Sequence, residues 1–344
     1  MEQDQASRKQ MRSSMRIIVL GCGSIGKRHI RNLLSIGAGE IVVCDINEKK
    51  LEAVKKEFSI KGFLDLDEAL SKDKYDVAFI CTPPSLHVDQ AMQLLDHGMH
   101  CFIEKPLSNS LVGIDGLMDM AEVNHKTVVI GYPLRFSPFL RKIKKLLDNR
   151  AIGKVLFLRA AVGYYLPYWR PDEDYREGYG SKQALGGGII LDASHEIDYV
   201  QYLLGDVSEV FATCKKLSAL EIDTEDFAEI IMHFKNGAYA QLHLDYLQSN
   251  YRRSCEIVGE GGMLLWDINE GQIRQYGLND KEYRVYYEGL NASVNDMYLE
   301  EMKHFFACIE SGTKPFISLE DGKQVQEIIA MIKDSSELRR FVSR

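Results

Sequence analysis

Residues 17–26 read IIVLGCGSIG, and residues 41–45 read IVVCD. The first stretch is an apolar run that ends in a glycine-rich turn, and a helix-like segment from Ile25 to Ser35 follows it. The second stretch is another apolar run, closed by Asp45. A strand, a G-x-G-x-x-G turn, a helix and an acid at the end of the next strand form the fingerprint of a dinucleotide-binding βαβ unit. The alternative is an ordinary strand-to-helix turn that contains glycines.

The residues of this turn have separate physical roles. Gly21 permits a tight turn, Gly23 lets backbone N–H groups approach a pyrophosphate, and Gly26 lets the helix pack close to the strand. Ser24 and Ile25 lie between the last two glycines, where the helix begins. We therefore predict that all five residues bind the cofactor.

Asp45 predicts which cofactor is bound. Its carboxylate is placed to accept hydrogen bonds from the ribose hydroxyls and would repel a 2′-phosphate. The next two residues, Ile46 and Asn47, supply no arginine that could bind such a phosphate. The sequence therefore predicts NAD in preference to NADP.

The bulk composition narrows the class of protein. The length of 344 residues suggests two domains. The net charge of -8 disfavours a general nucleic-acid surface. No apolar stretch reaches the roughly 18 residues that a membrane helix needs, and residues 1–14 lack the apolar core of a secretion signal. The seven cysteines form no C-x-x-C pair, which disfavours a disulfide framework and a zinc site. We expect a cytoplasmic protein without a membrane or nucleic-acid partner.

Two regions with different patterns predict an α/β protein. Strand-like and helix-like segments alternate along residues 15–135, which indicates a Rossmann domain with a doubly wound parallel sheet. Residues 136–344 indicate an α+β domain with a large, mostly antiparallel sheet. Its expected strands are 154–163, 207–216, 226–234, 238–246, 253–258, 263–266 and 282–287, and its expected helices are 189–204, 295–311 and 320–337. Residues 1–14 are expected to form a flexible tail, while 164–188 and 276–294 resist assignment.

A cofactor at the carboxyl edge of the parallel sheet requires a neighbouring group that moves the alcohol proton. Lys105 is the first candidate, because it follows the strand-like run 100–103 in the sequence Glu104-Lys105-Pro106. Pro106 restrains the backbone there, and partial desolvation would lower the proton affinity of the lysine toward a useful range. The alternative is an ordinary surface lysine after a strand.

The second candidate lies at the start of the expected helix 189–204, directly after the glycines at 186–188. Asp192, His195 and Asp198 are three residues apart and are expected to share adjoining parts of one helix face. His195 titrates near neutral pH, and a neighbouring carboxylate would raise its proton affinity and fix its tautomer. A metal site is a second interpretation, although there is no H-E-x-x-H pattern and no cysteine ligand. A helix-capping and core role is the third.

Several motifs occur in a family-specific order. They are GCGSIG at 21–26, Thr82-Pro83-Pro84 with His87, Glu104-Lys105-Pro106, Gly131-Tyr132-x-x-Arg135-Phe136, GGGIILDASHEID at 186–198 and PFISLEDG at 315–322. Together they resemble the glucose-fructose oxidoreductase and inositol dehydrogenase family, Gfo/Idh/MocA, from about Met15 to Leu338. The resemblance implies an N-terminal Rossmann domain, a C-terminal sheet used for substrate and for subunit pairing, and oxidation or reduction of a sugar or polyol hydroxyl.

The resemblance also implies a role for individual residues. Lys105 and His195 are implied as the catalytic pair, and Glu104 and Pro106 as residues that shape the nicotinamide site. The implied residues that line the cofactor are Thr82, Pro83 and His87, and the implied substrate contact is Arg135.

One departure from the family concerns Asp192. Members with the best understood polyol chemistry hold an aspartate four residues before the histidine, whereas Leu191 stands at that place here. Asp192 lies three residues before His195. We retain Asp192 as a third catalytic candidate whose role differs from that of the family aspartate.

The segment 164–188 is long for a loop, and loops of this length are often lids or binding loops. We expect Trp169, Arg170, Tyr175 and Arg176 to bind substrate. Aromatic rings stack on sugar or base faces, and guanidinium groups bind phosphate or carboxylate. The substrate is accordingly expected to be an acidic or nucleotide-linked sugar. An arm that clasps a neighbouring subunit is the alternative.

The sequence as a whole predicts an NAD-dependent oxidoreductase that acts on a secondary hydroxyl of a carbohydrate, without a metal. We expect a homo-oligomer formed through the C-terminal sheet. One alternative is a glycoside hydrolase that oxidises its sugar transiently and regenerates its NAD. Another is a non-catalytic NAD-binding sensor, although such a protein is expected to have lost Lys105 or His195.

Overall fold

The computed structural model describes residues 14–286 and 293–344, which form two compact units. The first unit comprises residues 14–108, 112–131 and 298–323. The second comprises the remaining described residues. The chain therefore returns to the first unit at residues 298–323. The expected division into 15–135 and 136–344 has no such return. The tail expected at 1–14 lies almost wholly outside the described residues.

The first unit has a six-stranded parallel sheet in the order β3-β2-β1-β4-β5-β6, which confirms the predicted Rossmann fold. Its strands are β1 (Arg16–Leu20), β2 (Glu40–Cys44), β3 (Lys61–Phe63), β4 (Val77–Ile80), β5 (His100–Glu104) and β6 (Val128–Gly131). Its helices include α2 (Ser24–Ser35), α3 (Glu48–Phe58), α4 (Leu66–Lys72), α5 (His87–Asp96), α6 (Ile114–Val123) and most of α11 (Val294–Ser311).

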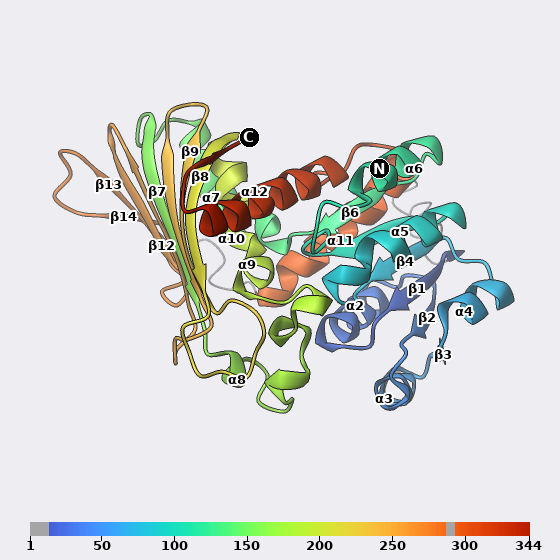
Figure 1. Cartoon of the computed structure of the whole chain (residues 1–344). Helices are drawn as coiled ribbons and strands as arrows, with labels where there is room; N and C mark the ends of the chain where they lie inside the picture. Colours follow the sequence, from blue (N-terminus) through green and yellow to red (C-terminus); the bar gives the residue numbers. More distant parts are fainter. Residues whose placement is uncertain (1–13, 287–292) are drawn as a thin grey trace. The chain divides into compact units, whose positions relative to one another are not determined.

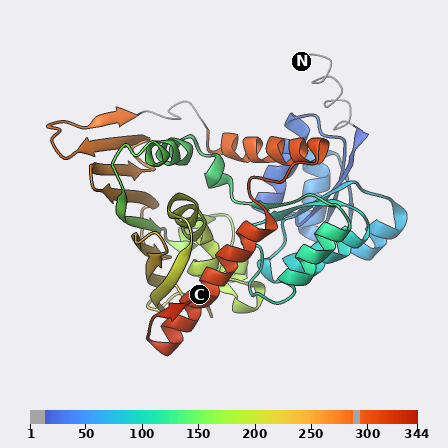
Figure 2. The ribbon, with the colours of Figure 1, turned by 90° about the horizontal axis from the view of Figure 1, so that it is seen from above.

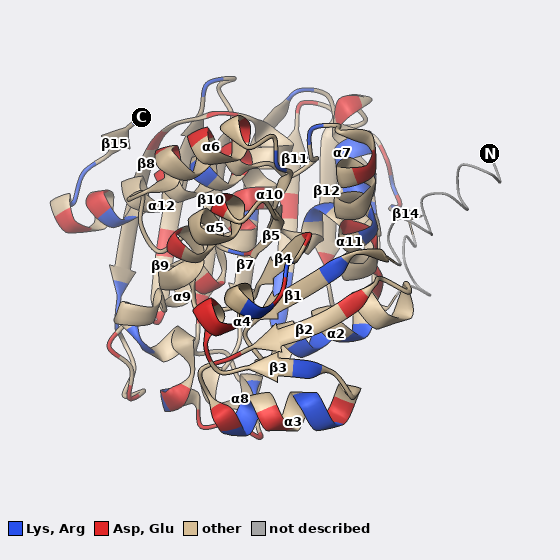
Figure 3. Ribbon diagram, turned by 90° about the vertical axis from the view of Figure 1, so that its right-hand side faces the viewer, with Lys and Arg blue, Asp and Glu red and all other residues tan. Residues whose placement is uncertain are grey.

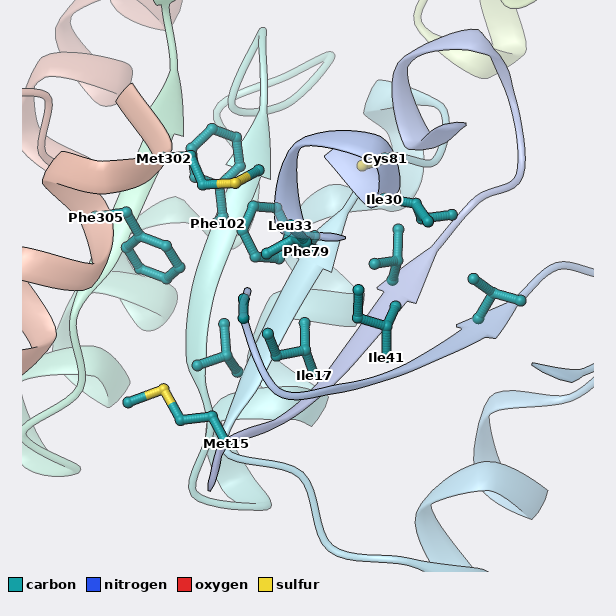
Figure 4. Close-up of a cluster of buried hydrophobic side chains, with 14 of the residues drawn as sticks. Met15, Ile17, Ile30, Leu33, Ile41, Phe79, Cys81, Phe102, Met302 and Phe305 are labelled. Atoms are coloured by element: carbon teal, nitrogen blue, oxygen red, sulfur yellow. The ribbon is translucent and has the colours of Figure 1, made fainter. Parts of the chain in front are cut away.

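The core of the first unit lies on the face of the sheet that α2 and α11 cover (Figure 4). The Phe79 and Phe102 rings of neighbouring strands are stacked with centroids 5.0 Å apart. Phe305 of α11 packs edge-on against Phe79 at 5.8 Å, and Figure 2 shows α11 beside the strands. Helices on both faces explain why these strands read as continuous apolar runs.

The second unit has a nine-stranded sheet in the order β14-β13-β12-β11-β7-β10-β9-β8-β15. Its strands are β7 (Val155–Gly163), β8 (Val207–Lys215), β9 (Phe227–Phe234), β10 (Tyr239–Asp245), β11 (Arg252–Gly259), β12 (Gly262–Asp267), β13 (Gln272–Gly277), β14 (Arg284–Tyr286) and β15 (Val342–Ser343). Only the central pair β7–β10 is parallel among the described pairs, so the predicted, mostly antiparallel sheet is confirmed.

Helices cover one face of the nine-stranded sheet, and no helix of the described residues lies on the other (Figure 1). They are α7 (Pro138–Asp148), α9 (Ile189–Asp192), α10 (Ser194–Leu204) and the second part of α12 (Leu319–Leu338). α12 is tied to β8 because the hydroxyls of Ser335 and Ser336 accept bonds from backbone N–H groups of that strand. We call the side without these helices the outer face of the sheet.

Charged residues of both signs are interspersed along exposed helices such as α3 (Figure 3). The four Lys and three Glu of α3 therefore do not form a patch of one sign on this helix. No helix in the described parts of the chain is both long and apolar enough to cross a bilayer.

Candidate active site

The glycine turn after β1 has the geometry that its sequence predicts. Gly21 has a φ of +97°, which residues with a side chain rarely adopt, and its N–H donates to the Cys44 carbonyl at 2.8 Å. A Cβ on Gly26 would lie 1.9 Å from the Gly21 carbonyl oxygen, so α2 can pack there only with glycine. A Cβ on Gly23 would meet no described atom within 4 Å. Open space therefore lies beside the N-terminus of α2, whose partial positive charge favours an anion.

Asp45 ends β2 with its carboxylate fixed by two backbone donors. The Cys22 N–H donates to Oδ2 at 2.6 Å, and the Asn47 N–H donates to Oδ1 at 2.7 Å. Each carboxylate oxygen can accept a further bond, so the ribose hydroxyls of a dinucleotide fit this half-buried group. Ile46 follows with 90% of its surface exposed.

The loop after β4 contains the predicted residues Thr82, Pro83 and His87. Thr82 and Pro83 are half-buried. The His87 ring is fully buried, with Nδ1 2.9 Å from the Pro106 carbonyl oxygen and Nε2 2.8 Å from that of Thr82. Burial lowers the pKa of His87, which favours the neutral ring. His87 was predicted to line the cofactor, which stays a prediction, and in the structure both ring nitrogens face backbone carbonyl oxygens.

Lys105 is half-buried directly after β5. The preceding Glu104 is only 6% exposed, and its Oε1 lies 2.6 Å from Nε2 of the buried His29 on α2. The sequence does not single out His29, because its partner is 75 residues away. The available signal is a polar residue three positions after Gly26, on the helix face that packs on the sheet.

In the second unit, the glycines at 186–188 allow three segments to approach one another. A Cβ on Gly187 would lie 2.3 Å from the Tyr179 carbonyl oxygen. Gly188 has a φ of +105°, and a Cβ there would lie 2.3 Å from Oε1 of Glu225. That same oxygen accepts the Ile190 N–H at 3.2 Å, so Glu225 fixes the start of α9. Burial raises the pKa of Glu225, which the sequence did not mark as part of the site.

The helix expected at 189–204 is divided into α9 and α10 by a break at Ala193. Asp192 ends α9, and His195 lies in the first turn of α10. The two residues therefore do not share one continuous helix face, which corrects the predicted arrangement. His195 is half-buried, and its ring packs edge-on against Tyr132 with centroids 5.8 Å apart.

Asp192 accepts hydrogen bonds from three tyrosines. The Tyr164 and Tyr179 hydroxyls each lie 2.5 Å from a different carboxylate oxygen, and the Tyr246 hydroxyl lies at 3.2 Å. Burial raises the pKa of Tyr164 and Tyr246 well above the usual range, so both hydroxyls remain donors. The carboxylate thus joins the end of β7, the loop 164–188 and the segment after β10.

Two buried ion pairs hold α10 directly after His195. Nε of Arg253 on β11 donates to Glu196 at 2.7 Å. Arg135 donates to Asp198 through Nε at 3.1 Å and through Nη2 at 2.7 Å. Arg135 is 4% exposed and Asp198 is fully buried. Arg135 was predicted to bind substrate, and in the structure its guanidinium donates to Asp198. Its substrate role stays a prediction.

The loop 164–188 carries the other predicted substrate residues. Trp169 is 47% exposed and packs against Tyr164 with ring centroids 4.4 Å apart. Arg176 makes a bidentate contact with Asp174 and a further one with Glu221, at 3.3 Å.

The remaining two loop residues also have partners within the second unit. Arg170 lies 3.5 Å from Glu173, and the Tyr175 hydroxyl accepts the Glu221 N–H at 3.2 Å. Both predicted arginines of the loop therefore have acidic partners within the same unit. Within the described chain, no three His, Cys, Asp or Glu side chains gather in an arrangement that could hold a metal ion.

Two domain models of one family match the chain. Residues 15–132 match an oxidoreductase family with an NAD-binding Rossmann fold, and residues 140–265 match the GFO/IDH/MocA C-terminal domain. The myo-inositol 2-dehydrogenase of Thermotoga maritima is 29% identical over 340 residues, which cover 95% of this chain and 98% of that protein.

Solved structures with the same fold cover almost the whole chain. A levoglucosan dehydrogenase in complex with NADH has a TM-score of 0.87 at 20% identity, covering 96% of this chain and 99% of that one. The WlbA dehydrogenase from Bordetella pertussis, in complex with NADH and UDP-GlcNAcA, has a TM-score of 0.82 at 21% identity, covering 96% and 98%. At 20% and 21% sequence identity, these two similarities show the fold alone.

Proposed function

The chain belongs to the Gfo/Idh/MocA oxidoreductase family, and from this premise we propose that it transfers a hydride between NAD and a secondary hydroxyl of a sugar or polyol. The observation that carries the proposal is the carboxyl edge of the first unit. There the glycine turn leaves space at the N-terminus of α2, and the fixed Asp45 carboxylate suits two ribose hydroxyls.

We assign the proton transfer to Lys105 and His195. NAD, when bound, supplies the hydride acceptor. One of the two side chains takes the proton that leaves the substrate hydroxyl, and the other donates a hydrogen bond to the developing alkoxide. Both side chains are half-buried, which is consistent with partial desolvation and with access from solvent. The presence of both residues disfavours the sensor alternative.

The loop 164–188 favours a neutral ring over the acidic or nucleotide-linked sugar expected from its arginines. Arg170 and Arg176 each have a carboxylate partner, so a substrate anion would compete with existing ion pairs. Trp169 keeps about half of its surface exposed, at 47%, and offers a flat apolar face. Such a face stacks on the C–H face of a sugar or polyol without requiring charge.

The test is hydride transfer with two neutral compounds, myo-inositol and levoglucosan, and one anionic compound, UDP-GlcNAcA. NADH absorbance in a stopped-flow instrument reports the chemical step. Lys105→Ala and His195→Ala are each expected to bind NAD normally and to lose about 10²–10⁴-fold in rate. The matched controls Lys74→Ala and His97→Ala change exposed residues and should leave the rate unaltered.

Near-normal rates in both active-site variants would place the acid–base group elsewhere. A preference for UDP-GlcNAcA over both neutral compounds would contradict the neutral-ring assignment. Protein that retains tightly bound NAD and hydrolyses a glycoside without net NADH formation would instead be the hydrolase alternative.

We also propose that two copies pair through the outer face of the nine-stranded sheet. Ile231 and Tyr239 on this face expose 40% and 50% of their surfaces. Arg159 and Glu256 lie side by side on it, so a second copy can offer complementary charges. Light scattering should report a dimer or a larger assembly, and Ile231→Lys should shift it toward monomer. A monomeric parent protein would contradict this proposal.

A further inference from the structure

Two fully buried histidines of the first unit meet the segment 104–106 from opposite ends. His29 comes from α2 and contacts Glu104, and His87 comes from the start of α5 and contacts Pro106. Lys105 lies between these contacts. A buried polar ring is costly unless it is hydrogen-bonded, so the specific partners of each histidine are informative.

The His29 ring is held in one orientation by its surroundings. Its centroid lies 5.3 Å from that of Phe79 and 5.0 Å from that of Phe102. Nε2 lies 2.6 Å from Oε1 of Glu104, while Nδ1 has no hydrogen-bond partner among the described residues. A carboxylate oxygen only accepts, so Nε2 is the donor in this contact.

The Glu104 carboxylate occupies a place that the neighbouring strand leaves for it. A Cβ on Gly131 of β6 would lie 3.3 Å from Oε1 of Glu104 and 3.0 Å from the Phe102 ring. The second oxygen, Oε2, accepts the Lys105 N–H at 3.2 Å. One carboxylate therefore links the His29 ring to the backbone N–H of Lys105.

His87 fixes the other end of the same segment. Its two ring nitrogens face the carbonyl oxygens of Pro106 and Thr82 at 2.9 and 2.8 Å. The ring therefore bridges the loop after β4 and the loop after β5, which are adjacent strands of the sheet.

We infer that His29 and His87 form a clamp that positions Lys105, with His29 acting through Glu104 and His87 through the Pro106 carbonyl. Both are positioning residues, because neither buried ring is available to touch substrate. The inference rests on the proposed role of Lys105. It adds that the helix whose N-terminus faces the pyrophosphate also sets the place of the proton-transfer group.

The primary test compares His29→Phe, His29→Gln and the parent protein. Phenylalanine fills the apolar pocket but donates nothing to Glu104, whereas glutamine retains an N–H donor. We expect His29→Phe to lower the hydride-transfer rate about 10–100-fold, since small misplacements of a reacting group are that costly. NAD affinity, from fluorescence titration, should remain within about threefold because Asp45 and the glycine turn are unchanged. His29→Gln should recover most of the rate.

A double-mutant cycle separates positioning from general damage. In a Lys105→Met background, His29→Phe should change the remaining rate less than about twofold, because its effect requires the lysine. Leu33→Ala, which removes buried core from the same helix, is the structural control. It should lower the melting temperature without selective loss of rate in folded protein. His87→Phe should resemble His29→Phe.

A substrate-free measurement keeps the inference testable if none of the three compounds reacts. Lysines carrying ¹³C-methyl groups report their surroundings by NMR, and Lys105→Arg identifies the signal of Lys105. The chemical shift of this signal should move toward the value of an exposed lysine in His29→Phe but not in His29→Gln. An unchanged signal and rate in His29→Phe would overturn the clamp. Full activity in Lys105→Met alone would instead show that the proposed function has the wrong proton-transfer group, and the clamp would fail with it.

Discussion

At the scale of single residues, Asp45 has the most direct consequence. The Cys22 and Asn47 N–H groups hold its carboxylate, so it cannot turn away from a 2′-phosphate. We predict that NAD binds more tightly than NADP and that Asp45→Ala narrows the difference. Loss of a charge-assisted bond should weaken NAD binding by about 1.5–3 kcal/mol, or roughly tenfold or more. Fluorescence titration of both cofactors measures this, with Glu52→Ala on the exposed side of α3 as the control. Equal affinities in the parent protein would contradict the assignment.

Residues with local requirements could be predicted from the sequence, and residues with distant partners could not. Gly21 and Gly26 follow from the turn geometry that one βαβ unit imposes, and Asp45 follows from its place at a strand end. His29 and Arg135 depend on carboxylates 75 and 63 residues away in the sequence. No short-range pattern encodes such a pairing, and the substrate role of Arg135 came only from the family resemblance.

The Arg135–Asp198 pair yields a stability prediction. Arg135→Leu leaves a buried carboxylate without its cation, which typically costs about 3–5 kcal/mol. Arg135→Leu with Asp198→Leu should be more stable than Arg135→Leu alone, because no lone charge remains buried. Urea unfolding followed by tryptophan fluorescence measures this, since both tryptophans, Trp169 and Trp266, lie in the second unit. A raised KM with unchanged stability in Arg135→Leu would contradict this stability role and support the predicted contact with substrate.

At the scale of elements, the break between α9 and α10 changes what Asp192 does. The aspartate holds three tyrosine hydroxyls that come from separate segments, so it organises the loop 164–188. We predict that Asp192→Ala destabilises the protein by about 1–3 kcal/mol for each buried hydroxyl left without a partner. The KM for substrate should rise more than kcat falls. The stability and the KM of Asp192→Asn should lie between those of the parent protein and of Asp192→Ala, because an amide can still bond to hydroxyls.

The same assays distinguish this structural role from proton transfer. If Asp192 relayed a proton with His195, Asp192→Asn would lower kcat by about 10²–10⁴-fold with little change in stability. Asp172→Ala, an exposed residue of the same loop, is the matched control. Limited proteolysis of the loop gives a third readout that responds only to loosening.

Elements with regular periodicity were predicted within a few residues, and the exceptions have physical causes. β13 alternates, but one inward position is Gln275, whose amide donates to the Ala151 carbonyl at 3.0 Å. The buried face of β13 therefore lacks the continuous apolar pattern that marks a strand in the sequence. The helix 189–204 was expected to be continuous because its sequence is amphipathic throughout. The break lies where Glu225 bonds the start of α9 and tyrosines bond Asp192 at its end.

At the scale of the whole molecule, the outer face of the sheet contains a histidine with two carboxylate partners. Nε2 of His243 lies 2.9 Å from Asp245, and Nδ1 lies 2.5 Å from Glu229. The bond to Asp245, against the opposing effect of burial and together with the bond to Glu229, raises the pKa of His243 to about 9. The ring is therefore charged at neutral pH and joins β9 to β10.

The raised pKa predicts how the stability of the second unit depends on pH. A group whose folded-state pKa exceeds its unfolded value of 6.5 stabilises the fold fully below pH 6.5. That contribution declines as pH rises from about 6.5 to 9 and is absent above it. We expect the tryptophan-monitored melting temperature of the parent protein to fall over this interval and that of His243→Gln to fall less. Gln241→Ala, on the same strand and face, should keep the parent slope, because it removes no titrating group. Parallel slopes for the parent and His243→Gln would mean that the imidazolium between the two carboxylates does not stabilise the sheet.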